Sequence, residues 1–437
     1  MRLTLALLTL LLFAPAAAVA AWSEQDLGGA HRFVDRTGLV VSGDGRALAT
    51  WSFADAVGNA SRFGASSATR PAGADRFEAP RALTPRTDAD RRAATVEGVA
   101  AYGATRALVA TTRQVGTSPQ PRIRLEVRFG STDGSFGKRI AIRTQRGLRS
   151  ASLSVNARGD AALAWFEDRG VRTDRVYVSL RRAGGRFGAP RRLATGRIRS
   201  VAAAIGARGD ALVAWNARGV VRTRFKPFKG DGFRATDTIR SKPTDFAELH
   251  PVVTPSGRAV LAWSAQFASE GGSRGPAHFQ TAARAPGARR FARAVLLETI
   301  PAAAYDGLGR PIDAVVDSTG AVAVAWRGAA GVRASRAGGA PQTLSAPGTT
   351  AVLSDLAAGP GGRLVAVWDG GADALASVVR AAVADGPAAP FGAPEDVSPA
   401  GRDSRFGSGA FLGDRPAVVL AGRGADRGDS VAEAYVR

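Results

Sequence analysis

The amino-acid sequence predicts an all-β fold, a single closed ring of four-stranded antiparallel blades. Three observations lead to this prediction. A turn followed by an apolar run that ends on Trp recurs along the 437-residue chain, successive copies end 42 to 63 residues apart, and three further strand-like segments recur between them. Eight blades are expected, or seven if one degenerate copy is not a true blade. Length alone suggests two or three domains, but an evenly spaced repeat favours one closed domain.

The repeated motif is clearest at Ala207–Asn216 and at Ala157–Phe166, which have almost the same sequence. Each copy begins with an Arg-Gly-Asp turn, in which Gly accepts a positive φ at no steric cost and Asp is a common turn residue. The run that follows does not alternate apolar and polar residues, so it predicts a strand that is covered on both faces. Two degenerate copies end at Thr111 and Ala421.

The Trp that closes each of the other copies is large enough to fill the space between neighbouring sheets. We expect these side chains at equivalent positions in the second strand of their blades, and we expect each indole N–H to need an acceptor. The six residues are Trp51, Trp165, Trp215, Trp263, Trp326 and Trp368.

One complete blade is predicted from Arg199–Ile205, the motif strand that ends at Trp215, Val220–Phe225 and Phe233–Ile239. The fourth segment begins with an aromatic residue that small residues or Pro follow, as in Phe187–Leu193. Because Pro cannot donate a ladder hydrogen bond, this segment is expected to be the outermost strand of each blade.

The two ends of the chain are predicted to share a blade. The last repeat ends with the strand-like segment Val431–Val436 and has no fourth segment. Near the other end, Trp22–Leu27 resembles a fourth segment and precedes the first inner strand, Gly38–Val41. The N-terminal strand should therefore complete the last blade and cover its open edge.

Residues Met1–Ala21 are typical of a secretory signal peptide. Arg2 supplies the positive charge, Leu3–Phe13 the apolar core, and Ala18–Ala20 a small-residue cleavage site. The propeller domain is expected to span residues 22–437 and to be secreted or held at the cell-envelope exterior. No later apolar stretch is long enough for a transmembrane span, and without Cys there is no disulfide, so a soluble monomer is expected.

Net charge is +22 and is concentrated in one part of the chain. From Arg113 to Lys229 there are 26 Lys and Arg but only 7 Asp and Glu. Such a cluster predicts an anionic partner, an anionic polysaccharide or another envelope polymer, because arginine binds carboxylate, sulfate or phosphate with two hydrogen bonds. Codon bias toward Arg is the alternative, since Lys occurs only four times in the chain. The predicted centre of the cluster comprises Arg182, Arg191, Arg192, Arg197 and Arg199.

The loops that follow each second strand and precede each first strand should surround one axial opening of the ring. They add Asp168, Arg169, Arg218, Asp306 and Arg310 to the predicted binding residues. Paired carboxylates near arginines are also what glycoside hydrolysis requires, so an extracellular carbohydrate-active hydrolase or lyase is the alternative function. Solvated loop charges without any chemistry are the simpler interpretation.

With these repeats the chain resembles secreted bacterial β-propellers, the broad class that includes sialidase-like and other extracellular repeat propellers. The resemblance implies the architecture only. Sialidase-type propellers carry Asp-box turns in which Trp lies three residues after Gly, whereas Gly45 and Trp51 lie six apart here. The resemblance therefore implies no sialidase active site in this chain.

Other catalytic and metal-binding patterns are weak. The three histidines, His31, His250 and His278, lack the short spacing of metal ligands, so no metal and no cofactor is expected. The Gly-x-Ser-x-Gly match at Gly271–Gly275 lacks the strand and helix that a nucleophile elbow needs. Nucleic-acid binding is disfavoured by secretion and by the few aromatic residues left for base stacking. The predicted function is a non-catalytic binding module.

Overall fold

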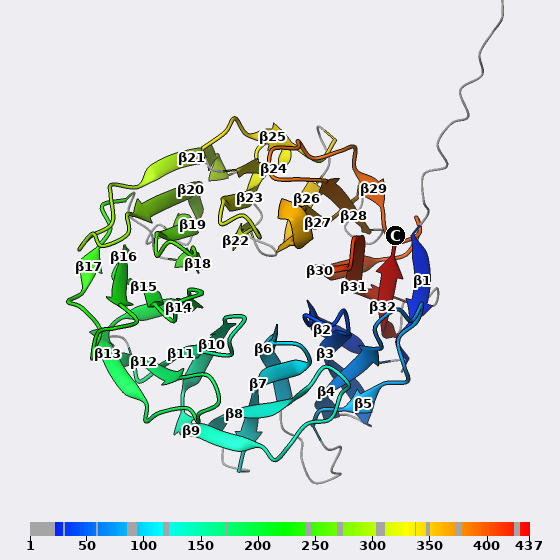
Figure 1. The fold of residues 1–437 in the computed structure, drawn as a ribbon, viewed down its shortest axis with the longest axis horizontal. Helices are drawn as coiled ribbons and strands as arrows, with labels where there is room; N and C mark the ends of the chain where they lie inside the picture. Colours follow the sequence, from blue (N-terminus) through cyan, green and yellow to red (C-terminus); the bar gives the residue numbers. More distant parts are fainter. Residues whose placement is uncertain are drawn as a thin grey trace, which may run out of the picture.

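The structure is a computed structural model, and it describes residues 22–28, 31–57, 60–84, 94–116, 122–170, 173–241, 246–268, 274–302, 311–336, 338–346, 350–371, 377–423 and 429–437. Eight four-stranded antiparallel sheets follow one another around a closed ring (Figure 1). The predicted all-β propeller is confirmed, with eight blades and not seven. The predicted signal peptide lies outside the described residues. In the described ranges, no helix is both long and apolar enough to cross a membrane.

Blades are numbered 1 to 8 in the order in which their inner strands occur along the chain. In each blade, strands A to D run from the inside of the ring outward (Figure 1). Blade 1 consists of β2 (Phe33–Val41), β3 (Ala47–Val57), β4 (Ala60–Arg70) and β5 (Arg81–Ala82), and blade 2 of β6 (Ala94–Tyr102), β7 (Arg106–Val115), β8 (Arg122–Ser131) and β9 (Ile140–Arg146). Blade 3 consists of β10 (Leu148–Val155), β11 (Ala161–Glu167), β12 (Asp174–Arg181) and β13 (Arg191–Gly196), and blade 4 of β14 (Ile198–Ile205), β15 (Ala211–Ala217), β16 (Val220–Lys226) and β17 (Asp237–Thr238).

Blades 5 to 8 have the same organisation, and a short 3-10 helix, η2 (Pro360–Gly362), lies in the A–B turn of blade 7. Blade 5 consists of β18 (Phe246–Val253), β19 (Ala259–Ala268), β20 (Arg274–Arg284) and β21 (Val295–Ile300), and blade 6 of β22 (Ile312–Val316), β23 (Val322–Gly328), β24 (Gly331–Arg336) and β25 (Gln342–Thr343). Blade 7 consists of β26 (Thr350–Ala358), β27 (Leu364–Gly371), β28 (Val378–Ala384) and β29 (Glu395–Asp396), and blade 8 of β30 (Ser404–Leu412), β31 (Arg415–Arg423), β32 (Ser430–Val436) and β1 (Ser23–Asp26).

The outer strands of blades 1, 4, 6 and 7 have only two residues each and are shorter than predicted, whereas those of blades 2, 3 and 5 have six or seven. In blade 4 the predicted segment Phe233–Ile239 contains only two residues of β17, Asp237 and Thr238. The aromatic residue that opens the segment lies before the ladder and packs inward, as Phe391 does in blade 7. In blades 1, 4 and 7 the segment begins as a core contact and pairs with strand C only after its Pro or small residues, which is consistent with the missing donor of Pro. In blade 3, Phe187 already forms a bridge with Arg181.

Outer strands are also joined to the next blade. Gln25 in β1 exchanges two hydrogen bonds with the backbone of Phe77 in blade 1, at 2.6 and 2.7 Å. Gln342 in β25 makes the same pair with Phe391 of blade 7, at 2.7 and 2.8 Å. A side-chain amide on one blade thus fixes the aromatic anchor of the next.

The shared blade is confirmed. Strand β1 pairs antiparallel with β32 over four residues, from Ser23 opposite Val436 to Asp26 opposite Glu433. The blue N-terminal strand lies beside the red C-terminal strand in Figure 1. Leu27 follows β1 and is buried between blades 1 and 8.

All six repeat tryptophans lie in strand B of their blades, and each is 0% exposed. Each one packs toward the preceding blade, as Trp215 of blade 4 does among Ala162, Val176 and Val178 of blade 3. One expectation was wrong. The Trp326 indole donates to Glu298 Oε2 at 2.8 Å, but the other five indole N–H groups have no acceptor among the described residues. They lie between sheets whose backbone groups are already engaged in ladders.

Candidate functional site

The ring has two loop-bearing faces. The D–A and B–C loops form one, the B–C face, and the A–B and C–D loops form the other, the A–B face. The predicted binding residues divide between them. Asp168, Arg169, Arg197, Arg199 and Arg218 lie at the B–C face, Arg182 lies in a C–D loop of the A–B face, and Arg191 and Arg192 begin the outer strand β13. Asp306 and Arg310 lie outside the described residues.

On the B–C face, blade 4 brings Arg197 and Arg218 together, because the Arg218 N–H donates to the Arg197 carbonyl at 3.3 Å. Together with Arg199 these side chains are exposed, and none forms an ion pair with a described residue. In blade 3 the charges are partly balanced, since Arg149 Nε lies 3.9 Å from Asp168 Oδ2.

The B–C-face carboxylates that could serve glycoside chemistry are largely committed to the fold. Glu167 is 0% exposed and accepts from Arg143 Nε at 2.8 Å and from Arg169 Nε at 3.2 Å. Asp174 accepts from the backbone N–H groups of Arg169, at 3.0 Å, and Ile198, at 2.9 Å. These groups link blade 3 to its neighbours and are not free to act on a ligand.

Carboxylates also connect the inner strands of neighbouring blades by accepting hydrogen bonds from the backbone. Asp313 in β22 accepts from the Leu356 N–H of the next blade at 3.2 Å. In turn, Asp355 in β26 accepts from the Gly409 N–H at 2.8 Å. The sequence suggests Asp313 as an axial carboxylate, but its main contacts join blades 5, 6 and 7. An unpaired backbone N–H at a blade seam is unfavourable, which explains an acid at these positions.

Six of the eight inner strands contain a register shift, and such bulges re-aim side chains at the rim of a ring. Three bulge residues, Arg36, Ser150 and Phe406, have positive φ although they are not glycine. Arg36 Nη1 lies 2.9 Å from Glu97 Oε2, which joins the rims of blades 1 and 2. No sequence pattern marked these residues, because glycine is the usual signal of a positive φ.

Asp369, which follows Trp368, is the B–C-face carboxylate best suited to hold a proton. Burial raises its pKa to about 6, although a hydrogen bond from the Ser354 hydroxyl favours the ionised form. The Asp403 carboxylate also contributes to the raised pKa, and Asp403 itself is paired with Arg405 at 2.8 Å and Arg423 at 3.4 Å.

His250 forms a buried ion pair across the seam between blades 5 and 6. Its Nδ1 lies 2.9 Å from Asp313 Oδ1, and its Nε2 lies 3.6 Å from Glu248 Oε1. Burial alone lowers the pKa of the imidazole, but Asp313 and Glu248 outweigh it and raise the pKa from 6.5 to about 9. The folded protein therefore binds a proton here that the unfolded chain releases near pH 6.5.

This pair predicts a pH dependence of stability. The contribution of His250 is fully present below about pH 6.5 and is lost as the pH rises through about 9, so the free energy of unfolding should fall by up to about 3 kcal/mol over that range. Urea unfolding at several pH values measures it. The His250→Asn variant should flatten the slope, and His278→Gln should preserve it. A wild-type curve that is flat from pH 6.5 to 9 would contradict the pairing.

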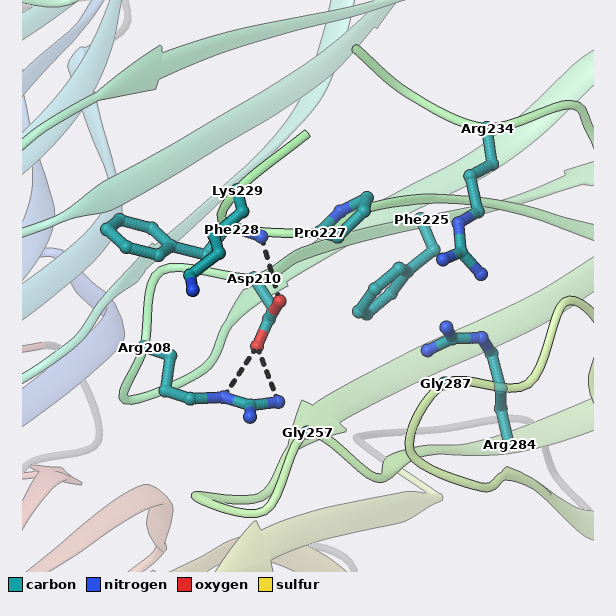
Figure 2. A pocket seen from close by; sticks show the side chains of 10 residues that line it. All are labelled: Arg208, Asp210, Phe225, Pro227, Phe228, Lys229, Arg234, Gly257, Arg284 and Gly287. Atoms are coloured by element: carbon teal, nitrogen blue, oxygen red, sulfur yellow. Dashed lines mark hydrogen bonds and ion pairs between the residues drawn. The ribbon is translucent and has the colours of Figure 1, made fainter. Parts of the chain in front are cut away.

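On the A–B face, a pocket of about 270 Å³ lies where the turns of blades 4 and 5 meet (Figure 2). Its lining is basic and aromatic and contains one acid. The residues are Arg208, Asp210, Phe225, Pro227, Phe228, Lys229, Arg234, Gly257, Arg284 and Gly287. No local sequence pattern marks this site, because its members come from four turns that are distant along the chain.

The pocket continues onto the arginine cluster of blade 3. Arg158 and Arg182 lie over the ring of Phe228, at 5.3 and 5.9 Å from its centroid. Burial lowers the pKa of Lys226 most, and the charge of Arg182 lowers it next. The charge of Arg191 lowers this pKa as well. The structure therefore brings Arg182 and Arg191 together beside the pocket, and places Arg197, Arg199 and Arg218 on the opposite face.

No protein-family model and no characterised protein matches the sequence. Among solved structures, the chain is similar to the Dos1 propeller, with a TM-score of 0.50 and 10% identity over 94% of this chain and 95% of that one. It is also similar to a protein of unknown function from Dyadobacter fermentans (TM-score 0.42, 10% identity, 95% and 97% covered). The NanB sialidase from Streptococcus pneumoniae gives a TM-score of 0.40 and 8% identity, with 93% and 68% covered. At 10% identity the likeness to the Dos1 propeller shows the propeller fold alone.

Within the described ranges, no group of three or more His, Asp and Glu residues is arranged to hold a metal ion.

Proposed function

We propose that this propeller is a secreted, non-catalytic binding module that recognises an anionic polymer, such as an acidic polysaccharide of a cell envelope. One observation carries the proposal. The five central arginines of the basic sector, Arg182, Arg191, Arg192, Arg197 and Arg199, are exposed, and none forms an ion pair with a described residue. Exposed guanidinium groups without carboxylate partners are suited to carboxylate, sulfate or phosphate.

The A–B face is the proposed binding face. There Arg158, Arg182 and Arg191 lie near one another and near Lys226, and the aromatic ring of Phe228 lies beneath two of them. At physiological salt, exposed charges more than about 8 Å apart are largely screened, so only close groups act together. Of these three arginines only Arg158 forms an ion pair with a described residue, Asp160, at 2.6 Å. Clustering thus supports this face over the B–C face, where Asp168, Glu167 and Asp174 offset part of the charge.

Three triple charge reversals test the proposal, and each changes the net charge equally. The variant Arg182→Glu/Arg191→Glu/Arg192→Glu removes the A–B-face cluster, and Arg197→Glu/Arg199→Glu/Arg218→Glu removes the B–C-face group. The control reverses Arg32, Arg76 and Arg106, which are exposed arginines of blades 1 and 2 without ion pairs to described residues.

We expect the wild-type protein to be retained on a sulfated or carboxylated polysaccharide column and to elute with salt. The first variant should elute at markedly lower salt, the second at slightly lower salt, and the control close to the wild type. Equal losses in all three would show a protein that is merely basic, and the proposal would fail.

The alternative is a carbohydrate-active hydrolase or lyase on the B–C face, and Asp369 is the observation that favours it. A carboxyl group with a pKa of about 6 near a second carboxyl group, Asp403, which pairs with Arg405, is the kind of arrangement that acid catalysis of glycoside cleavage uses. Reducing-sugar release from acidic polysaccharides that disappears in Asp369→Asn would establish this activity. We favour binding because Glu167, Asp174 and Asp313 are engaged in contacts between blades.

A further inference from the structure

We propose that the pocket between blades 4 and 5 on the A–B face binds one oxyanion group, a carboxylate, sulfate or phosphate, with Arg284 as its buried receptor and Arg234 as its second cation. The inference deepens the proposed function and depends on it for the source of the anion, a polymer group or a free ion.

Arg284 is a buried cation that no described carboxylate pairs with. It ends strand β20 and is only 2% exposed. Its Nε and Nη1 atoms are buried and have no hydrogen-bond acceptor, and no carboxylate in the described ranges forms an ion pair with it. A buried charge is strongly unfavourable unless it is paired and hydrogen-bonded, so this position calls for a counter-ion.

Equivalent arginines in other blades show how the position is satisfied elsewhere. The last residue of strand C, opposite the first residues of strand B, is Arg181 in blade 3 and Arg336 in blade 6. Arg181 donates to the carbonyls of Gly159 and Gly185, and Arg336 donates to those of Gly362 and Gly386.

Arg284 makes no such hydrogen bonds to described residues, although Gly257 and Gly287 of the corresponding turns line the pocket; the Ala288 carbonyl accepts from Arg234 instead. Arg70 of blade 1 is also buried with an unpaired Nε, but it does not line this pocket.

A second guanidinium faces the first. In Figure 2 the head groups of Arg234 and Arg284 point toward one another, and no dashed line ends on either. The described bond of Arg234 leads away, from Nη1 to the Ala288 carbonyl at 3.0 Å. Burial, and next the charge of Arg234, lower the pKa of Arg284, and the weaker opposing effects of Asp210 and Asp237 do not offset them. An oxyanion between the two groups would replace this repulsion with charge-assisted hydrogen bonds.

The single acid of the pocket is not available to either arginine. Asp210 Oδ2 accepts from Arg208 Nε and Nη2, both at 3.2 Å, and Oδ1 accepts from the Phe228 N–H at 2.9 Å. These bonds hold the carboxylate beside Arg208, on the far side of Phe225 from Arg284 in Figure 2. The net charge that lines the pocket is therefore positive.

The apolar lining indicates what kind of molecule the anionic group belongs to. The Arg284 guanidinium lies 3.7 Å above the Phe225 ring, which fixes its plane, and Pro227 and Phe228 continue the apolar wall. A volume of about 270 Å³ is just below the ~300 Å³ at which pockets begin to enclose a whole drug-sized ligand. The pocket thus fits one charged end or side group with a small carbon skeleton. A polymer could continue from it over Phe228 toward Arg158 and Arg182.

Thermal unfolding of the full chain tests the site, with inorganic sulfate and with glucuronate as probes at constant ionic strength. We expect both probes to raise the Tm of the wild type. Arg284→Met should abolish this rise, and it should itself raise the Tm without anion, because it removes an unpaired buried charge while keeping the apolar stem. The matched control is Arg336→Met, which should lower the Tm without anion but keep the rise.

Calorimetric titration with sulfate should show at least tenfold weaker binding to Arg284→Met than to Arg336→Met. An equal Tm rise or equal affinity in the two variants would overturn the proposal. Column retention distinguishes the source of the anion, since Arg284→Met should weaken retention if a polymer group enters the pocket and should leave it unchanged if a free ion does.

The anion pocket and the polymer-binding function can be disproved separately. If the arginine reversals on the A–B face abolish retention while Arg284→Met binds sulfate as the wild type does, the pocket is wrong and the polymer-binding function stands. If Arg284→Met loses the sulfate response and no polysaccharide retains the wild type, the site stands without the polymer.

Discussion

Replacing Trp215 with Ala should lower the free energy of unfolding by about 3 to 5 kcal/mol. The indole is 0% exposed and lies between strand B of blade 4 and the sheet of blade 3. Its neighbours belong to ladders on both sides of the gap, so they cannot move inward to fill the space that the ring leaves. Urea unfolding followed by far-UV circular dichroism measures the loss, because the substitution removes a fluorophore.

Phe63→Ala is the matched control, since Phe63 is an aromatic residue of strand β4 that is 44% exposed. Its loss should change the free energy of unfolding by about 0.5 kcal/mol or less. Equal effects of the two substitutions would contradict the position of Trp215 in the core.

The tryptophans also differ among themselves. Trp326 donates to Glu298, whereas the Trp215 indole N–H has no acceptor in the described part of the chain. Trp326→Phe should therefore cost more than Trp215→Phe, because only the first change removes a hydrogen bond and leaves Glu298 Oε2 with Arg333 as its remaining donor.

Removing residues 22–27 should destabilise the ring by several kcal/mol and promote self-association. The deletion removes the four ladder pairs between β1 and β32 and the buried Leu27 side chain, whose burial alone contributes about 1.5 to 3 kcal/mol. It also removes both Gln25 bonds to Phe77 and the bond from the Trp22 indole to Glu395 at 3.1 Å. Strand β32 would then become an open edge.

Size-exclusion chromatography and thermal unfolding check this expectation. Leu27→Ala separates the two effects, since it keeps the strand and should lower the Tm without exposing an edge. A truncated chain with the Tm and elution volume of the full chain would refute the role of β1.

The fold could be predicted from the sequence because each blade repeats one pattern, and a repeat constrains all its copies at once. The positions of the six tryptophans, the outer place of the Pro-containing segment and the closure by Trp22–Leu27 all follow from that pattern. The lengths of the outer strands did not, because pairing there depends on how far each C–D loop extends before it meets strand C.

The site was much less predictable. Arg182 and Arg191 do lie together, but Arg197 and Arg199, only a few residues further along, lie on the opposite face because strand β13 runs between them. Arg284 lies outside the basic stretch and resembles Arg181 and Arg336 in sequence position. Its lack of a carboxylate partner depends on the turns of two blades, so no local sequence pattern predicts it. The sequence suggests Asp313 as an axial acid, but Asp313 accepts a hydrogen bond from the backbone of the next blade.

The strand that closes the ring also constrains how the ring is assembled. Ser23 Oγ donates to the Val436 carbonyl, and these residues are 413 positions apart in the chain. Contacts of such separation carry a large loop-closure cost and form late, whereas the hairpins of strands A, B and C within each blade are local. Blades 1 to 7 can therefore form their sheets from contiguous sequence, while β1 must remain unpaired until β32 is in place. During that interval both strands are open edges, and association between two incompletely folded chains through β1 of one and β32 of the other is the competing reaction.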